Sequence, residues 1–186
     1  HKSMRIWDTS TWDEIAFLEG HGNEILHFEF SPDGNQLVTT SVDETARIWN
    51  VRTKAYKELQ GHGGFVNCAT FSPDGSIVVT SCHDGEARIF DAATGSQIRS
   101  FTGHLSRVDN LRFQGDGKLL ISASQDLTAR IWDPQTVEWV VEPLRHPERV
   151  RWATISDDGT RAATACNDGI VRIWDATNGR KLFELP

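Results

Sequence analysis

A short set of residues recurs along this chain at nearly constant intervals, and this repeat limits the fold more than any other feature does. Trp7, Trp49, Phe90, Trp132 and Trp174 follow one another at spacings of 42, 41, 42 and 42 residues. A period of this length indicates that one small structural unit is repeated and stacked, because a single unit could not bury its apolar surface alone.

Three further markers keep the same register. A histidine begins each period, a Gly-containing turn follows it, and an aspartate comes six residues before the strand-end aromatic. The histidines are His21, His62, His104 and His146, the turns are 32–34, 73–75, 115–117 and 157–159, and the aspartates are Asp43, Asp84, Asp126 and Asp168. Four markers in one register identify a structural unit rather than a chance similarity.

Each period is predicted to hold four β-strands, because short apolar runs alternate with Pro-Asp, Asn-Gly and Asp-Gly turn residues and no helical periodicity is sustained. In the first strand, apolar residues come at steps of three and then two, as in Ile25, Phe28 and Phe30, which predicts a bulge. The second strand is apolar or small on both faces and is expected to be the most buried. The fourth, at the outer rim, is expected at Ile15–Leu18, Ala55–Leu59, Gln97–Phe101, Glu138–Val141 and Lys181–Leu185.

The repeat resembles that of the WD-repeat family from one end of the chain to the other, with Gly-His near the start of a unit and Trp-Asp near its end. The resemblance implies an all-β propeller arc of four complete four-stranded blades after a leading half-blade. The half-blade is expected at 1–20 and the blades at 21–61, 62–103, 104–145 and 146–186. Such an arc implies either a slice of a longer propeller or a ring assembled from several copies, and an isolated arc is expected to self-associate through its open faces.

The resemblance also implies a buried hydrogen-bonded network of His, Ser or Thr, Asp and Trp in each blade. A closed network would satisfy every buried polar group. Phe90 has no N–H to donate, and Arg145-His146-Pro147 replaces the usual Gly-His, so we expect departures in the second and last blades. The implied sets are His21, Thr39, Asp43, Trp49; His62, Thr80, Asp84, Phe90; His104, Ser122, Asp126, Trp132; and His146, Thr164, Asp168, Trp174.

Family members usually bind partners around the central channel, through positions three and five after the histidine and one before the aspartate. These positions vary here while the framework repeats, as expected where specificity is encoded. We therefore expect a protein or peptide interaction scaffold, with Arg107, Arg149 and Arg151 receiving an acidic or phosphorylated segment. The full set is Glu24, Leu26, Val42, Phe65, Asn67, His83, Arg107, Asp109, Gln125, Arg149, Arg151 and Asn167. The alternatives are a sensor or targeting module of a larger enzyme-containing protein and a self-assembling ring module.

Other functions are disfavoured. The His, Ser or Thr and Asp sets recur in every unit, whereas a catalytic site occurs once, and histidines on different blades cannot converge on one metal ion, so we expect neither catalysis nor a metal or cofactor. The net charge of −7 argues against nucleic acid, and no apolar run approaches the roughly 20 residues of a membrane helix. Cys68, Cys82 and Cys166 are expected as buried thiols of a cytoplasmic or other reducing compartment.

The repeating arginines and the tryptophans outside the repeat are both expected to have packing roles. An arginine precedes each strand-end aromatic by two residues, and its aliphatic stem is expected to lie along that aromatic ring on the same face of the strand. The tryptophans outside the repeat, Trp12, Trp139 and Trp152, are expected to pack between blades or at the rim.

Overall fold

The computed structural model describes residues 1–186, and its regular structure consists entirely of β-strands. The strands are β1 (Ser3–Trp7), β2 (Glu14–Glu19), β3 (Ile25–Phe30), β4 (Gln36–Ser41), β5 (Ala46–Asn50), β6 (Tyr56–Leu59), β7 (Val66–Phe71), β8 (Ile77–Cys82), β9 (Ala87–Asp91), β10 (Gln97–Phe101), β11 (Val108–Phe113), β12 (Leu120–Ser124), β13 (Thr128–Trp132), β14 (Leu144–Arg145), β15 (Val150–Ile155), β16 (Arg161–Cys166), β17 (Val171–Asp175) and β18 (Lys181–Leu185). There is no helix that could cross a membrane.

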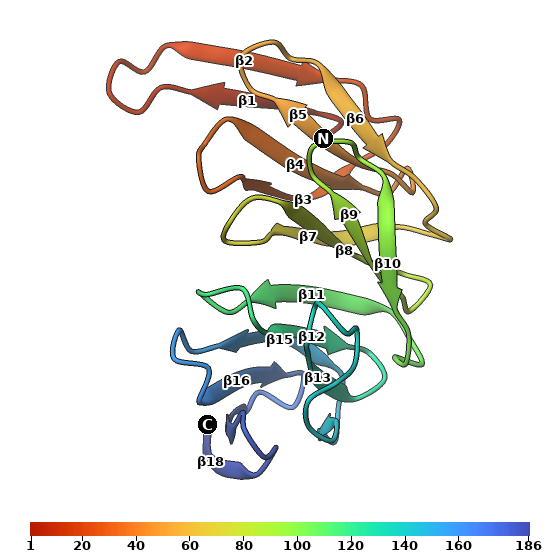
Figure 1. Ribbon diagram of the computed structural model, residues 1–186, viewed down its shortest axis with the longest axis vertical. Coiled ribbons are helices and arrows are strands. Elements are labelled where there is room, and N and C mark those ends of the chain that lie inside the picture. The colour runs from red at the N-terminus through yellow and green to blue at the C-terminus, as the bar shows by residue number, and fades with distance from the viewer.

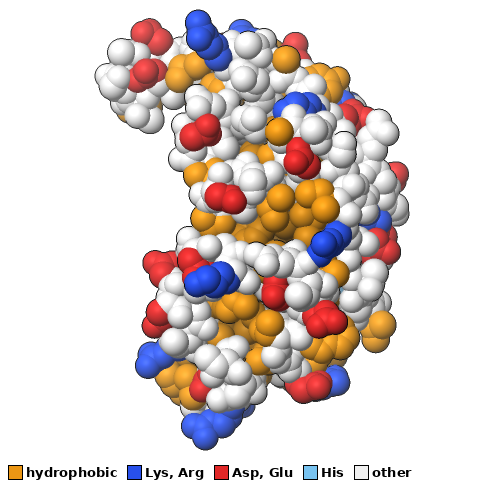
Figure 2. All heavy atoms as spheres, viewed as in Figure 1, with side chains coloured by type: hydrophobic (Ala, Val, Ile, Leu, Met, Phe, Trp, Pro, Cys, Tyr) orange, Lys and Arg blue, Asp and Glu red, His pale blue; other side chains and the backbone are white.

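The strands form one two-stranded and four four-stranded antiparallel sheets, each made from consecutive strands. We call β3–β6 blade 1, β7–β10 blade 2, β11–β14 blade 3 and β15–β18 blade 4, and β1–β2 the leading hairpin. The sheets follow one another in chain order along the long axis of the molecule (Figure 1). Their outline is an open crescent, with hydrophobic side chains visible between successive layers (Figure 2). The fold is therefore an all-β propeller arc that does not close into a ring.

The core is divided among the interfaces between neighbouring sheets. Val38 and Ile48 of blade 1, for example, belong to one apolar cluster with Ala69 and Phe90 of blade 2. A similar cluster joins blade 2 to blade 3, another joins blade 3 to blade 4, and a smaller one joins the leading hairpin to blade 1. Each blade is thus held mainly by its neighbours, as in other stacked repeats.

The second strand is almost wholly buried in blades 1 to 3, which have a neighbouring sheet on both faces, although the first strand of blade 2, β7, is buried at every residue. Every residue of β12 is buried, and so is every residue of β4 and β8 after the first. In β16, by contrast, buried and less buried residues alternate, because no further sheet lies on the outer face of blade 4. The burial of the second strand therefore depends on the neighbouring sheet as well as on its sequence.

A bulge interrupts the pairing of the first two strands in every blade. The register shifts between Ile25 and His27, between Val66 and Cys68, and at the matching points of blades 3 and 4. One residue of the first strand is left unpaired each time, which turns the chain and redirects that side chain.

The prediction of a fourth strand at Glu138–Val141 is wrong. Trp139 makes only an isolated bridge with Trp132, and the regular pairing resumes at β14, where Leu144 lies opposite Ala129. Blade 1 needs only the four residues of β6 to cover the corresponding part of β5. In blade 3, the Val140 N–H still donates to the Ile131 carbonyl of β13 at 2.9 Å, but residues 141–143 belong to no strand, and Pro143 has no N–H to contribute to a sheet. The apolar residues at 139–141 therefore precede the fourth strand, and Leu144 occupies the strand position that we predicted for them.

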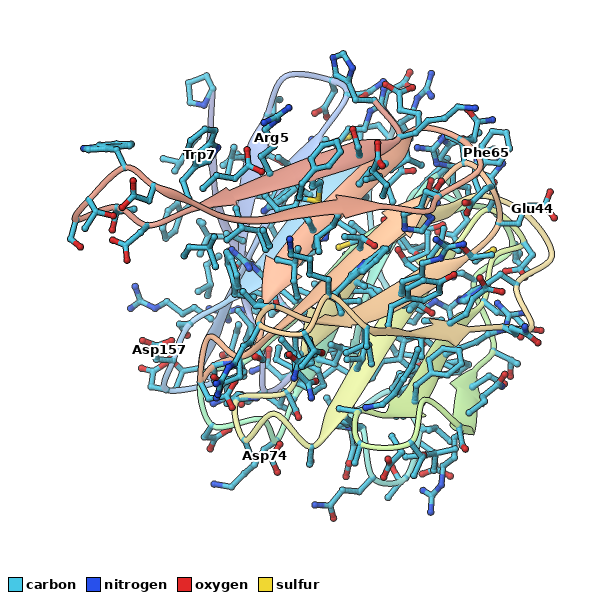
Figure 3. All side chains as sticks on the ribbon, turned by 90° about the horizontal axis from the view of Figure 1, so that it is seen from above. Arg5, Trp7, Glu44, Phe65, Asp74 and Asp157 are labelled. Carbon is cyan, nitrogen blue, oxygen red and sulfur yellow. The ribbon has the colours of Figure 1, made fainter.

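The two ends of the strands form two different faces. One carries the loops before each first strand and between each second and third strand; we call it the His–Asp face because both network residues lie there. The opposite end carries the Gly-containing turns, and we call it the turn face. Glu44 and Phe65 mark the first face, well away from Asp74 and Asp157 on the second (Figure 3).

Candidate functional site

The polar network is complete in blade 1. The Trp49 indole N–H donates to Thr39 Oγ1 at 2.9 Å, and His21 Nε2 lies 2.7 Å from the same hydroxyl. His21 Nδ1 lies 2.8 Å from Asp43 Oδ2, which also accepts the Gly22 N–H at 2.7 Å. If the Thr39 hydroxyl donates to Nε2 and Nδ1–H donates to the carboxylate, every member is satisfied by a neutral imidazole. The network ties the loop before β3 to the interior of the blade.

Blade 3 repeats this arrangement. The Trp132 indole donates to Ser122 Oγ at 2.8 Å, and the two ring nitrogens of His104 lie 2.7 Å from Ser122 Oγ and from Asp126 Oδ2. A second hydroxyl also holds the carboxylate, since Thr128 donates to Asp126 Oδ1 at 2.6 Å.

Burial and hydrogen bonds act in opposite directions on the ionisable groups of these networks. Burial lowers the pKa of His21 and His104, although the facing aspartates partly offset this. Burial alone would raise the pKa of Asp43, but hydrogen bonds from Thr45, His21 and Gly22 lower it to about 2. At neutral pH an uncharged histidine therefore lies beside an ionised aspartate.

In blades 2 and 4 the aspartate lies outside the network, contrary to the sequence expectation. Asp84 Oδ2 accepts from Arg88 Nη2 at 2.8 Å, and Asp168 Oδ2 accepts from Arg172 Nη2 at 2.6 Å. His62 Nδ1 has no hydrogen-bond partner, while His146 Nδ1 donates to the Leu144 carbonyl at 3.0 Å. Both histidines keep their hydroxyl contacts, at 2.9 Å to Thr80 and 2.7 Å to Thr164. Burial lowers the pKa of each imidazole to about 4.

The residue two positions after the aspartate differs between the two kinds of blade. Thr45 and Thr128 donate their hydroxyls to Asp43 and Asp126 in the complete networks. Glu86 and Ile170 stand at this position in blades 2 and 4 and offer no hydroxyl, so a nearby arginine binds the carboxylate instead. Sequence reasoning missed this signal although it can be read directly from the chain.

Two features of the chain add to the departure in blade 4. Gly22, Gly63 and Leu105 each donate a backbone N–H to the aspartate of their own blade. Pro147 occupies the matching position and has no N–H. His146 also follows Leu144 by two residues, whereas His21 follows Leu18 by three, so the imidazole lies close to a different carbonyl.

The repeating arginines contact an aromatic ring in those sheets whose last strand, or the segment in its place, contains one. Arg5, Arg47 and Arg130 place their guanidinium carbons 4.8, 4.4 and 4.6 Å from the ring centroids of Phe17, Tyr56 and Trp139. These closest rings belong to the fourth strand or its remnant, rather than being the strand-end aromatic that we expected; Trp49 and Trp132 are each 5.9 Å away. Arg88 and Arg172 have no such ring contact and form ion pairs with Asp84 and Asp168, while Arg5 and Arg47 pair with Glu14 and Glu58 in addition to their ring contacts.

The candidate partner-binding residues lie on loops with a repeating backbone connection. In each blade, the residue before the aspartate donates its N–H to the carbonyl of the residue three after the histidine. The pairs are Val42 to Glu24 at 2.9 Å, His83 to Phe65 at 2.9 Å, Gln125 to Arg107 at 2.9 Å and Asn167 to Arg149 at 3.0 Å. The backbone is therefore held alike in all four blades while the side chains differ.

The remaining candidates, five residues after each histidine, are the bulge residues of the first strands. Leu26, Asp109 and Arg151 occupy these bulges, so the strand irregularity and the candidate face are one feature. Asn67 differs because its side chain is buried and its Nδ2 donates to the Val108 carbonyl at 2.9 Å. It connects blades 2 and 3 and does not contribute a free side chain to the face.

The candidates of blades 2, 3 and 4 form a continuous chain of contacts. Phe65 stacks on His83 with ring centroids 5.1 Å apart, and Arg107 Nη1 donates to His83 Nε2 at 2.9 Å. Arg107 Nε contacts the Asp109 carboxylate, and Arg151 Nη1 approaches the same carboxylate at 3.6 Å. We call Arg107, Asp109 and Arg151 the arginine bridge.

The structure does not bring the candidates of blade 1 into this chain. The side chains of Glu24 and Leu26 are both exposed. Arg149 is half-buried and lies just before β15, two residues from Arg151. The face therefore divides into a basic part on blades 3 and 4 and a part on blade 1 with an acidic and an apolar residue.

Other groups proposed from the sequence have simple surroundings. Cys68, Cys82 and Cys166 are buried free thiols, and burial raises the pKa of Cys68 to about 12 and of Cys82 to about 11. No set of three His, Cys, Asp or Glu residues is arranged to hold a metal ion.

The tryptophans outside the repeat differ from one another. Trp139 packs on Trp132 with ring centroids 5.9 Å apart, as expected of rim packing. Trp12 is 73% exposed, so the packing expectation is wrong for this residue, and Trp152 is also exposed on the outer face of blade 4.

Comparison with known proteins agrees with this geometry. The model of the family described as WD domain, G-beta repeat matches residues 12–50, 53–91, 95–133 and 141–175, which together make up well over half of the chain. Similar relatives include the APC/C activator protein CDH1 of Saccharomyces cerevisiae, 38% identical over 52 residues that make up 28% of this chain and 9% of the relative. Protein FIZZY-RELATED 2 of Arabidopsis thaliana is 46% identical over 46 residues, 25% of this chain and 10% of its own length.

Lissencephaly-1 homolog 1 of Paramecium tetraurelia is 33% identical over 57 residues, 31% of this chain and 14% of its own length. These matches span only about a tenth of the relatives, so they concern single stretches of repeat. The four family matches, the stacked four-stranded sheets and the recurring polar networks lead to one conclusion: the chain belongs to the WD-repeat family.

Proposed function

We propose that this chain is a protein-interaction scaffold without chemistry of its own and that its His–Asp face recognises the partner. One observation carries the proposal: four backbone-bonded loop pairs present non-repeating side chains on a repeating, well-packed framework. Variable side chains on a fixed backbone provide specificity without a large ordering cost on binding. Each histidine network belongs to the framework, because similar groups recur in all four blades.

The partner segment is acidic or phosphorylated in this proposal. Arg107, Arg149 and Arg151 come from two neighbouring blades, and Asp109 is the single carboxylate of the arginine bridge. Guanidinium groups bind carboxylates and phosphates through paired N–H donors, so these arginines offer complementary charge and geometry. The relatives support a protein partner in general terms, since one is named an activator of APC/C. We place the protein in a reducing compartment because its buried thiols are free.

Site-specific photo-crosslinking tests the recognition face. A photoreactive amino acid at Phe65 on the His–Asp face should give a discrete protein adduct in cell extract, whereas the same amino acid at Lys54 on the turn face should not. Excess unlabelled protein should compete the adduct away. Equal adducts at both positions would contradict the proposal that the His–Asp face is the binding surface.

The acidic-segment proposal is tested with fluorescein-labelled hexaglutamate in an anisotropy titration. Arg149→Ala with Arg151→Ala should weaken binding roughly tenfold or more, because two charge-assisted contacts are removed. The matched control is Arg161→Ala with Arg180→Ala, which removes two exposed arginines near the turn face. Equal binding by the two double variants would refute the assignment of these arginines.

A further inference from the structure

Asp109 has an unusual position among the candidate partner-binding residues. It is the bulge residue of β11, its side chain is only 6% exposed, and it lies between guanidinium groups from blades 3 and 4. Neither carboxylate oxygen accepts a hydrogen bond, although Arg107 is in contact and Arg151 is within 3.6 Å. The carboxylate thus neutralises charge without making the directional bonds that fix an arginine–carboxylate pair.

Both arginines have a second partner that holds them in place. Arg107 Nη1 donates to His83 Nε2 at 2.9 Å, and Arg151 Nε donates to Asn167 Oδ1 at 3.0 Å. His83 is in turn stacked on Phe65. The positions of the two guanidinium groups therefore rest on blades 2 and 4 as well as on Asp109.

We infer that Asp109 is a specificity-determining residue that competes with the partner for the two arginines. This inference rests on the proposed function, because it concerns the same face and an acidic partner. An incoming carboxylate must share Arg107 and Arg151 with an internal carboxylate and is repelled by it at short range. Segments with several negative charges overcome this competition, whereas singly charged segments bind poorly. Asp109 thus lowers the affinity for acidic segments while it keeps the two arginines paired when no partner is bound.

The test replaces the carboxylate with an amide of the same shape. Asp109→Asn in the full-length protein should bind fluorescein-labelled hexaglutamate roughly three- to thirtyfold more tightly than the wild type at low salt, because a short-range repulsion is removed. The gain should shrink as salt is added. The matched control is Asp116→Asn, which removes one carboxylate paired with Lys118 on the turn face and changes the net charge equally. Near-ultraviolet circular dichroism establishes that all variants are folded.

The outcomes separate the inference from the proposed function. If D109N binds no more tightly than D116N while R149A/R151A loses binding, competition by Asp109 is refuted and the acidic site stands. Weaker binding by folded D109N would make Asp109 a scaffold for the arginines and would also refute competition. If neither the wild type nor D109N binds hexaglutamate, the acidic-segment proposal and the inference both fail. Tighter binding of hexaglutamate by D109N, without the same increase in D116N, supports the inference.

Discussion

The partner of the network aspartate in each blade varies with the residue two positions after it. Where threonine stands two residues after the aspartate, the carboxylate is held between that hydroxyl and the histidine, as with Thr128 and His104 around Asp126. Where the hydroxyl is absent, as at Glu86, an arginine four residues after the aspartate binds the carboxylate. The same framework thus has two alternative polar arrangements for this carboxylate.

Replacing Thr128 by valine tests this choice. Thr128→Val keeps the shape of the side chain but removes the donor to Asp126 Oδ1, so Arg130 should turn towards the carboxylate and His104 should lose its aspartate. The free energy of unfolding should fall by about 1 kcal/mol, the usual net contribution of a hydrogen bond. Urea unfolding gives the free energy, and a crystal structure shows the position of Arg130. Thr102→Val, at an exposed site, is the control, and a fall of equal size there would contradict the explanation.

The two histidines without an aspartate should make the protein sensitive to mild acid. The pKa of His62 is about 4 in the folded chain, against an ordinary value near 6.5 for an unfolded one. Between these values the unfolded state binds more protons, so stability falls as the pH is lowered. Below about pH 4 protonation of Asp84 extends the loss, because hydrogen bonds lower the pKa of this carboxyl to about 2 in the folded chain.

His62→Gln removes one of these groups and should therefore flatten the pH dependence. The loss of unfolding free energy between pH 7 and pH 5 should be smaller by about 2 kcal/mol than in the wild type. Urea unfolding at both pH values measures it, whatever the cost of the substitution at pH 7. A variant with the wild-type pH dependence would show that His62 protonates as readily in the folded chain as in the unfolded one.

At the scale of the strand, much of the fold could be predicted from the sequence, and the exceptions have physical reasons. The repeat predicts the stacked sheets, and the uneven spacing of Ile25, Phe28 and Phe30 predicts the bulge. The fourth strand of blade 3 could not be placed, because Trp139 and Leu144 are both apolar and only the pairing with Ala129 distinguishes them. Periodicity identifies which residues are apolar but does not identify which of two neighbouring segments pairs.

The candidate site shows a similar division. The repeat identifies the loops and the residues that vary on them, such as Arg107 and Arg151. The sequence could not show that Asn67 turns inward to the next blade or that Asp109 lies between two arginines, because both contacts join different sheets. Contacts between blades depend on how the sheets stack, and the local sequence pattern does not show which side chains of two neighbouring blades come close together.

The rim of blade 3 depends on a glycine that lets Trp139 approach the chain. A Cβ atom at Gly103 would lie 2.9 Å from Trp139 Cζ3 and 2.8 Å from Arg130 Nη1. Gly103→Ala should therefore displace the indole from the arginine and lower the free energy of unfolding by about 1–3 kcal/mol more than backbone strain alone. Gly103→Ala in a Trp139→Ala background is the control, because the backbone strain at Gly103 is unchanged there while the indole is absent. Equal losses with and without Trp139 would show that the contact with Trp139 is unimportant.

At the scale of the whole molecule, burial between sheets decides which apolar side chains remain exposed. Phe28 and Phe30 of β3 are 57% and 47% exposed, whereas Ala69 and Phe71, at the matching positions of blade 2, are 0% and 4% exposed. Blade 1 covers these two residues of blade 2, but the leading hairpin has only two strands and packs on Leu37 and Trp49 instead. An apolar surface is therefore exposed on β3 within the described chain.

This surface should cause residues 1–186, prepared alone, to self-associate as their concentration rises, because exposed apolar patches favour association. Phe28→Ser with Phe30→Ser should shift sedimentation towards the monomer, since both side chains are about half exposed and their removal takes away adhesive surface. It should lower the free energy of unfolding less than Phe71→Ser, which leaves a cavity between blades 1 and 2. Association that persists unchanged in the double variant would place the contact elsewhere. The outer face of blade 4, where Trp152 and Phe183 are exposed, would then be the surface to replace next.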